Sequence, residues 1–267
     1  MPQVQVGDIS MNYEEQGEGE PLVLMHYTSA DNASWAFQYG DYAPRYRCIS
    51  MDLRGSGLTD KPPGPYSTEQ CAEDVVGLMD ALGLERAHVA GMSLGAAIGL
   101  WIAARHPERV VSLSLHSGWH RTDAYLRAAL ETWRTIAQAR GSVPEGVIES
   151  VLPWCFTPET YANTEFIDTI EGFIRSRPEQ PLEAFLSQCD AVLAHDASGV
   201  LGDIRAPTLL TYGRHDQVTS LRFADPLMSG IKGAELAIFE DCSHAGLHEN
   251  AAEFNSVTLD FLGRHTA

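Results

Sequence analysis

Positive charge is scarce in this chain of 267 residues, which has 18 lysines and arginines against 36 aspartates and glutamates, a formal net charge of −18. A surface with such an excess of negative charge repels the phosphates of nucleic acids and of anionic lipids. The acidic residues are spread along the chain, as is typical of a solvated surface. We therefore expect neither a nucleic acid nor a membrane among its partners.

Long apolar runs and secretory features are also missing. No stretch approaches the roughly 20 apolar residues that a membrane-spanning helix needs, and the N-terminus has neither the basic start nor the apolar segment of a secretory signal. The five cysteines form no CxxC pair and no zinc-binding spacing. Such an odd, widely spaced set is typical of reduced thiols, so we expect a cytoplasmic protein. The cysteines are Cys48, Cys71, Cys155, Cys189 and Cys242.

The chain does contain short apolar runs that alternate with helical patterns. Its length and its 44% of apolar residues suit one α/β domain with an insertion. The alternation predicts a mostly parallel, doubly wound sheet covered by helices on both faces, with an antiparallel hairpin at one edge. Strands are expected at residues 4–6, 9–13, 22–25, 47–51, 87–90, 110–115, 208–212 and 236–239, and core helices at 68–82, 96–104 and 251–262.

Residues 119–195 break this alternation. They contain no convincing strand, several prolines, and helical patterns such as 125–140 and 182–193. We interpret them as a helical lid inserted between two core strands, with the core formed by residues 1–118 and 196–267.

A serine, Ser93, lies between two glycines in the segment Gly-Met-Ser-Leu-Gly at residues 91–95, directly after an apolar run. A tight turn of this pattern between a strand and a helix exposes the serine hydroxyl as a nucleophile, and its crowded backbone favours glycine. Gly95 and Gly99 lie one helical turn apart, which lets the helix pack closely on a sheet. The five-residue pattern alone is weak, because a glycine-rich turn without a catalytic role also fits it.

A serine nucleophile needs a base, usually a histidine, and the histidine needs an orienting carboxylate. Asp216 follows the predicted strand 208–212, and His244 lies in the loop after the predicted strand 236–239. Open α/β sheets place functional side chains past such strand ends. The joint occurrence of the two residues, each after its own strand, therefore favours a catalytic triad with Ser93.

Other interpretations of these residues remain open. Asp216 also fits a turn or a helix cap, and His215 and His248 compete with His244 on composition alone. His244 and His248 have the i, i+4 spacing of metal ligands, but no glutamate lies between them in a His-Glu-x-x-His pattern. No lysine follows the glycines of residues 91–99, so this segment is not a phosphate loop. We expect no metal and no cofactor.

Several stretches carry a resemblance to a known family. They are Leu24-Met25-His26 with Trp35, Met51-Asp52-Leu53-Arg54-Gly55-Ser56-Gly57, Gly91-Met92-Ser93-Leu94-Gly95, Ala206-Pro207-Thr208-Leu209-Leu210 leading to Gly213 and Asp216, Ser243-His244, and Ser117-Gly118-Trp119 at the start of the lid. With them the chain resembles α/β-hydrolases of the esterase and lactonase type over nearly its whole length, and among these the enol-lactonases and the aminoacrylate hydrolase of pyrimidine breakdown. The chain order serine, aspartate, histidine is that of this family.

The resemblance implies an oxyanion hole, in which two backbone N–H groups stabilise the negative charge on the reacting oxygen. They belong to Leu94, after the nucleophile, and to Thr28, in the loop after the third strand. The family usually has His-Gly in this loop, whereas this chain has His26 and Tyr27. The hydroxyl of Tyr27 is expected either to reach the substrate or only to fill space.

Together these residues predict a serine hydrolase acting on a small molecule. Ser93 attacks a carbonyl carbon, His244 takes and returns the proton, and Asp216 orients His244. The expected substrate is a small carboxylic ester or lactone chosen by the lid, where Trp119 and Trp154 either line an acyl pocket or belong to the core. Alternatives are a carbon–carbon or carbon–nitrogen bond hydrolase with the same triad, and a non-catalytic ligand-binding receptor or a biosynthetic synthase or cyclase on the same fold.

Overall fold

The computed structural model of the chain describes residues 2–266. Its strands form one eight-stranded sheet in the order β1-β2-β4-β3-β5-β6-β7-β8. The pairs β1–β2 and β2–β4 are antiparallel, and all other neighbours are parallel. The predicted fold class, with its hairpin at one edge, is thereby confirmed. The strands are β1 Gln3–Val6, β2 Ile9–Gln16, β3 Glu20–Met25, β4 Tyr46–Met51, β5 Ala87–Met92, β6 Val110–His116, β7 Thr208–Gly213 and β8 Glu235–Phe239.

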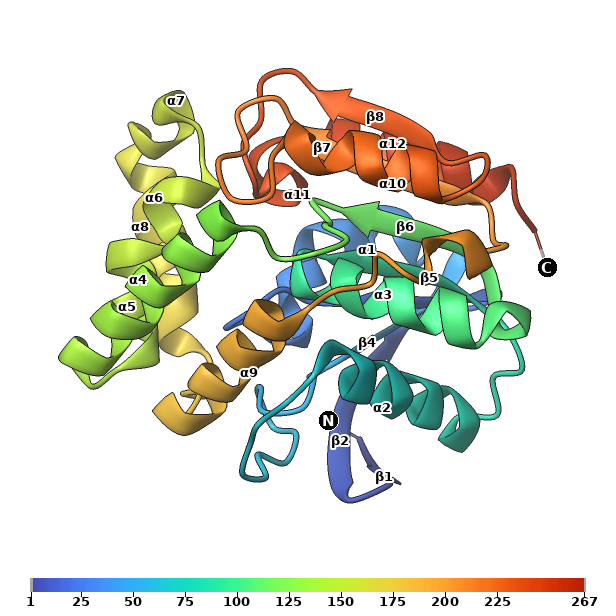
Figure 1. Cartoon of the computed structure of the whole chain (residues 1–267), viewed down its shortest axis with the longest axis horizontal. Helices are drawn as coiled ribbons and strands as arrows, with labels where there is room; N and C mark the ends of the chain where they lie inside the picture. Colours follow the sequence, from blue (N-terminus) through green and yellow to red (C-terminus); the bar gives the residue numbers. More distant parts are fainter. Residues whose placement is uncertain (1, 267) are drawn as a thin grey trace.

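Helices cover both faces of the sheet (Figure 1), and each face has its own apolar core. On one face, α2 (Thr68–Ala81), α3 (Leu94–Arg105) and α10 (Ala224–Gly230) bury side chains in one large cluster. On the other face, α1 (Ala36–Tyr42) and α12 (Ala251–Gly263) enclose a second cluster. Short helical turns complete the core: η1 Asn32–Trp35, η2 Pro107–Arg109, η3 Leu201–Asp203, η4 Leu221–Phe223 and α11 Gly246–Glu249.

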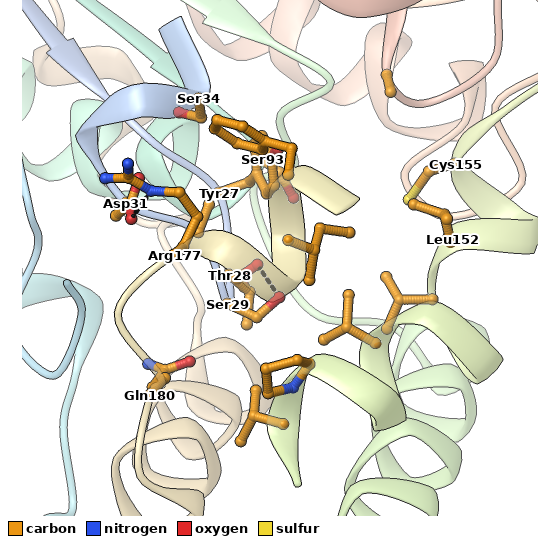
Figure 2. A pocket seen from close by; sticks show the side chains of 18 of the residues that line it. Tyr27, Thr28, Ser29, Asp31, Ser34, Ser93, Leu152, Cys155, Arg177 and Gln180 are labelled. Carbon is orange, nitrogen blue, oxygen red and sulfur yellow. Dashed lines mark hydrogen bonds and ion pairs between the residues drawn. The ribbon is translucent and has the colours of Figure 1, made fainter. Parts of the chain in front are cut away.

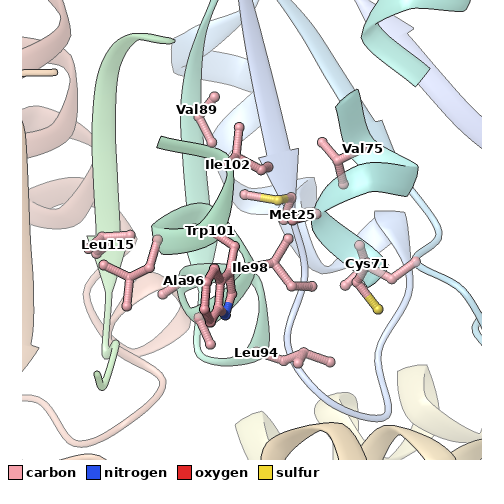
Figure 3. Close-up of a cluster of buried hydrophobic side chains, with 14 of the residues drawn as sticks. Met25, Cys71, Val75, Val89, Leu94, Ala96, Ile98, Trp101, Ile102 and Leu115 are labelled. Carbon is pink, nitrogen blue, oxygen red and sulfur yellow. The ribbon is translucent and has the colours of Figure 1, made fainter. Parts of the chain in front are cut away.

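The centre of the sheet is buried on both sides, which explains its continuous apolar runs. Every residue of β5, β6 and β7 is buried. Helix α3 lies so close to the sheet that a Cβ atom on Gly99 would come within 3.2 Å of Leu113, as the spacing of Gly95 and Gly99 predicts. Figure 3 shows Ile98 of this helix near Met25 of β3, in the larger of the two cores.

Between β6 and β7 the chain forms six α-helices and no strand. They are α4 Ala124–Arg140, α5 Val143–Ser150, α6 Leu152–Cys155, α7 Pro158–Tyr161, α8 Thr164–Ser176 and α9 Leu182–Ala194. In Figure 1, α4 to α8 stand beside the sheet, and α9 leads back to it. The division of the chain at residues 118 and 196 stays a prediction. Within residues 2–266, no helix has both the length and the apolar character of a membrane span.

The two ends of this helical insertion meet at its base. The Nε2–H of His195 donates to the carbonyl oxygen of Trp119 at 3.2 Å, and Nδ1 accepts from the hydroxyl of Thr68 on α2 at 2.9 Å. The Thr122 N–H adds a bond to the carbonyl oxygen of His195 at 3.0 Å. Burial lowers the pKa of His195 to about 4, so the ring is neutral at pH 7. These bonds fasten the insertion to the core.

Candidate active site

Ser93 lies on a sharp turn between β5 and α3. Its backbone has φ 52° and ψ −113°, a strained conformation for a residue with a side chain. A Cβ atom on Gly91 would lie 2.2 Å from the carbonyl carbon of Gly95, and one on Gly95 would lie 2.3 Å from the carbonyl oxygen of Met25. Glycine is therefore required at both positions by lack of space. The Ser93 N–H donates to the carbonyl oxygen of His116 on β6 at 2.9 Å, which holds the turn against the sheet.

Asp216 and His244 are brought together past the ends of β7 and β8. The Nδ1 of His244 lies 2.9 Å from Oδ2 of Asp216, and Oδ1 accepts from the N–H groups of Val218 at 2.7 Å and Thr219 at 3.0 Å. Burial acts to raise the pKa of Asp216, but the adjacent His244 and these N–H donors outweigh it and leave the pKa below its ordinary value. The carboxylate therefore stays ionised and fixes the proton of His244 on Nδ1.

A glycine lets the two loops approach each other. A Cβ atom on Gly213 would lie 2.0 Å from the carbonyl oxygen of Ser243, so no larger residue fits there. The N–H of His215 donates to the carbonyl oxygen of Cys242 at 2.9 Å, which joins the loops next to the aspartate–histidine pair. The side chain of His215 is exposed and lines no part of the pocket described below, so its position does not suit a base.

Thr219 and Ser117 hold His244 in position through hydrogen bonds, a role that the sequence interpretation did not identify. The Thr219 hydroxyl donates to the carbonyl oxygen of Ser117 at 2.7 Å, and its oxygen lies 3.2 Å from both Asp216 Oδ2 and His244 Nδ1. The Ser117 hydroxyl in turn donates to the carbonyl oxygen of His244 at 3.1 Å. The sequence did contain a signal for both residues. Ser117 belongs to a stretch that carries the family resemblance, and Thr219 follows Asp216 by three residues.

Ser93 and His244 line one pocket between the core and the insertion. In Figure 2, Tyr27, Thr28 and Asp31 lie on the same side of it as Ser93, whereas Leu152 and Cys155 lie opposite. The insertion supplies mostly apolar side chains: Trp133, Val143, Pro144, Val147, Val151, Leu152, Phe156, Phe173 and Ile174. The pocket therefore has a polar core side and an apolar lid side. Among residues 2–266, no group of three or more His, Cys, Asp or Glu side chains is arranged to hold a metal ion.

The loop after β3 is shaped by His26, which is fully buried. Its Nε2 accepts from the N–H of Leu53 at 3.0 Å, so Nδ1 carries the proton and donates to the carbonyl oxygen of Tyr27 at 2.7 Å. Because C=O and N–H point in opposite directions across a trans peptide, this bond also sets the direction of the Thr28 N–H. Thr28 lines the pocket, and Leu94 begins α3 directly after Ser93. Both predicted oxyanion donors thus belong to segments next to the serine.

Tyr27 lines the pocket, and its hydroxyl oxygen lies 3.3 Å from Nε2 of His248. Burial lowers the pKa of His248 to about 4, so this ring is neutral at pH 7. His248 is therefore held by Tyr27, whereas His244 is the histidine that contacts Asp216. Of the three histidines weighed from the sequence, only His244 combines a carboxylate partner with a place on the pocket wall.

Trp119 and Trp154 do not line the pocket among the residues that the structure describes. Trp119 is 1% exposed at the base of the insertion, where its ring contacts His195, and Trp154 is 40% exposed on the surface. Their positions do not support the predicted substrate contact, because helix spacing turns Trp154 away while its neighbours Leu152 and Cys155 face the cavity. Trp133 lines the pocket instead.

Comparisons with known proteins agree with this geometry. The family model described as alpha/beta hydrolase fold matches residues 21–251. A protein of Azorhizobium caulinodans, whose name provisionally assigns it as a carbamate hydrolase, is 31% identical over 98% of both chains. The 2-hydroxy-6-oxo-6-phenylhexa-2,4-dienoate hydrolase of Comamonas testosteroni is 30% identical over 96% of this chain and 92% of its own.

The same family appears among solved structures. The enol-lactonase from Burkholderia xenovorans LB400 superposes with a TM-score of 0.87 at 28% identity, over 98% of this chain and 100% of its own. Both the match of residues 21–251 to the family model and the hydrolases found as relatives confirm the resemblance carried by the sequence motifs. The chain belongs to the α/β-hydrolase fold family and is a hydrolase.

Proposed function

We propose that this hydrolase cleaves a small carboxylic ester or lactone through a covalent acyl-enzyme at Ser93. The observation that carries the proposal is the strained Ser93 turn on the wall of the pocket that His244, bonded to ionised Asp216, also lines. A strained turn that exposes a serine next to a histidine–carboxylate pair is the arrangement that nucleophilic catalysis requires. The solved enol-lactonase of similar fold supports a lactone or ester as the substrate class.

The mechanism follows from the hydrogen bonds of the pair. Asp216 occupies Nδ1 of His244, so Nε2 is the nitrogen that takes the Ser93 proton as the hydroxyl oxygen attacks the carbonyl carbon. The N–H groups of Thr28 and Leu94 stabilise the oxyanion. His244 then protonates the leaving alcohol and next removes a proton from water, whose oxygen attacks the acyl carbon and releases the acid and the free serine.

A second candidate is hydrolysis of a carbon–nitrogen or carbon–carbon bond with the same triad. It is supported by the names of two relatives, which refer to carbamate hydrolysis and to hydrolysis of a 2-hydroxy-6-oxo-dienoate. Ser93 attacks the carbonyl carbon in the same way in both reactions. The leaving group is protonated on nitrogen in carbamate hydrolysis and on carbon, as an enolate, in carbon–carbon bond hydrolysis. For either reaction we keep a cytoplasmic location as a proposal, supported by five cysteines that are free.

The test is covalent labelling combined with turnover. A fluorophosphonate should label Ser93, and 4-nitrophenyl butyrate should release nitrophenol in a burst. Ser93→Ala should lose labelling and at least about 10³-fold in kcat, whereas Ser198→Ala, at an exposed position, should keep both. Full esterase activity in the Ser93→Ala protein would refute the mechanism. Labelling without any ester turnover would favour the carbamate or carbon–carbon candidate, and neither labelling nor turnover would favour a non-catalytic receptor.

A further inference from the structure

Arg177 is the one charged residue among the lid residues 119–195 that line the pocket. It caps the C-terminal end of α8, and its Nε–H donates to Oδ2 of Asp31, in the loop that follows β3, at 2.7 Å. Its guanidinium carbon also lies 5.6 Å from the ring centre of Phe173. In Figure 2 the pair lies on the same side of the pocket as Ser34 and Ser93. A cation is thus placed on the wall of the cavity, on a lid side that is otherwise mainly apolar.

The hydrogen-bonding capacity of Arg177 is mostly unused. A guanidinium has five N–H groups, and of the five in Arg177 only the Nε–H has a hydrogen-bond partner within residues 2–266. Asp31 contacts the guanidinium through Oδ2 alone. Its other oxygen, Oδ1, accepts from the N–H of Ala33 at 3.0 Å. Asp31 is 5% exposed, so it holds the guanidinium in a fixed place and balances its charge while both terminal amino groups remain available.

A second arginine between core and lid shows what a purely structural contact looks like. Arg222 lines no part of the pocket and uses all three nitrogens. Nε donates to Asp123 at 2.8 Å, Nη1 to the Ser220 hydroxyl at 2.9 Å and Nη2 to the Val218 carbonyl oxygen at 2.8 Å. Arg177 differs both in facing the cavity and in its unused donors. A tether alone does not account for this difference.

We propose that Arg177 binds a carboxylate of the substrate, so that the enzyme prefers esters or lactones carrying a second, anionic carboxylate remote from the scissile bond. This inference rests on the proposed function and specifies its substrate class. A planar guanidinium matches a carboxylate with two parallel N–H···O bonds. The Ser34 hydroxyl lines the same pocket, is buried, and has no hydrogen-bond partner among the described residues, so it supplies a further donor. The overall charge of −18 disfavours an anionic ligand elsewhere on the protein, so a carboxylate needs a local cation such as Arg177.

The decisive comparison uses two isosteric substrates, the mono-4-nitrophenyl ester of adipic acid and that of adipamic acid, together with shorter and longer homologues. Wild-type kcat/KM should be about 10- to 100-fold higher for the acid than for the amide at the best chain length. Arg177→Gln should bring this ratio close to one by losing activity on the acid only. Arg222→Gln, the matched control, should leave the ratio unchanged.

Asp31→Asn separates recognition from tethering, because it breaks the same ion pair but keeps the cation. If Arg177 binds the substrate carboxylate, Asp31→Asn should keep or raise the acid-to-amide ratio. If Arg177 only tethers the lid to the core, Asp31→Asn and Arg177→Gln should lose activity equally on both substrates. A wild-type ratio near one at every chain length would overturn the proposal while leaving the ester hydrolase intact. Calorimetric binding of adipate and adipamide to Ser93→Ala protein makes the test independent of turnover: adipate binding that disappears with Arg177→Gln supports the proposal, and binding that is absent or unchanged refutes it.

Discussion

The two sides of the pocket differ in how their side chains are held. On the core side, Asp216, Thr219 and His244 are joined to one another by hydrogen bonds, and His26 fixes the loop that leads to Thr28. On the lid side, the lining is mainly apolar and is positioned by packing, with Arg177 as its charged member. Hydrogen bonds fix direction, whereas apolar packing fixes mainly volume.

The difference indicates a division of labour within one cavity. Attack and proton transfer need atoms in fixed directions, which loops anchored at the ends of β5, β7 and β8 provide. Substrate choice needs a shaped volume and few polar anchors, which the lid provides. Hydrogen bonds join the two sides at several points. The N–H of Ala245 donates to the carbonyl oxygen of Cys155 at 2.9 Å, the N–H of Thr157 to Glu249 at 2.7 Å, and Gln188 to the carbonyl oxygen of Arg54 at 3.0 Å, while His195 closes the base. Changes at the joints, in the lid and on the core side should therefore have separable effects.

The largest effect is expected at the joint formed by His195. Its folded pKa of about 4 lies below the unfolded value near 6.5, so unfolding takes up a proton between these pH values. Stability should therefore fall as the pH drops from 6.5 toward 4, by up to roughly 3 kcal/mol from this residue. Urea unfolding at pH 7.5, 6 and 5 measures this slope.

His195→Gln should be less stable than wild type at pH 7.5, because it lacks the bonds to Trp119 and Thr68. The free energy of unfolding of this variant should also depend less steeply on pH, because unfolding takes up as much as one proton fewer than in wild type. His106→Gln, at a partly exposed histidine beside Glu73, is the control for replacing a histidine by glutamine as such. Parallel slopes for His195→Gln and wild type would show that this ring does not titrate on unfolding.

A smaller effect is expected from the lid side alone. Phe156 lines the pocket and packs edge-on against Phe166, with ring centres 5.7 Å apart. Phe156→Leu should shift the preference among 4-nitrophenyl esters toward longer acyl chains by about tenfold in kcat/KM, because extra pocket volume is worth 1–3 kcal/mol per methylene. Activity on the acetate should change little, since the core side is untouched.

Phe166→Leu is the matched control, because Phe166 supports Phe156 without lining the pocket among the described residues. It should destabilise the lid without changing the acyl-chain preference. An equal shift in both variants would mean that lid packing as a whole, rather than the pocket wall, selects the substrate. The division between the two sides would then be less sharp than the contacts indicate.

The core side is also the part that could be predicted from the sequence. The Ser93 turn and the strands before Asp216 and His244 are local features, marked by glycine spacing and continuous apolar runs, and the strands and turn appear where they were expected. Helix α1 was not expected, since it contains Gly40 and begins without a side-chain cap. Local sequence patterns predict secondary structure well, because steric limits on the backbone and burial of side chains act residue by residue.

The lid side could not be predicted in the same way. The Asp31–Arg177 contact joins residues 146 positions apart, and Thr157–Glu249 joins residues 92 apart. No periodicity encodes such contacts, because they depend on how the lid helices sit over the sheet. For the same reason the sequence could not show which tryptophan of the insertion lines the pocket. Trp133 does, whereas Trp119 packs at the base of the insertion and Trp154 faces solvent.

The smallest effect is expected for Tyr27→Phe, which tests whether the core side also contributes to substrate choice. The Nδ1 of His248 is buried and has no hydrogen-bond partner in the described part of the chain, and a buried N–H without an acceptor is rarer than a bare acceptor. The proton of the neutral ring therefore belongs on Nε2, which donates to the Tyr27 hydroxyl oxygen and leaves the tyrosine proton for the substrate.

Tyr27→Phe should raise KM about fivefold with little change in kcat, because it removes one hydrogen bond worth about 1 kcal/mol. Tyr39→Phe, which removes a buried hydroxyl bonded to Ser50 away from the pocket, should leave KM unchanged. Identical kinetics in both variants would make Tyr27 a filler of space, and substrate choice would then belong to the lid side and Arg177 alone.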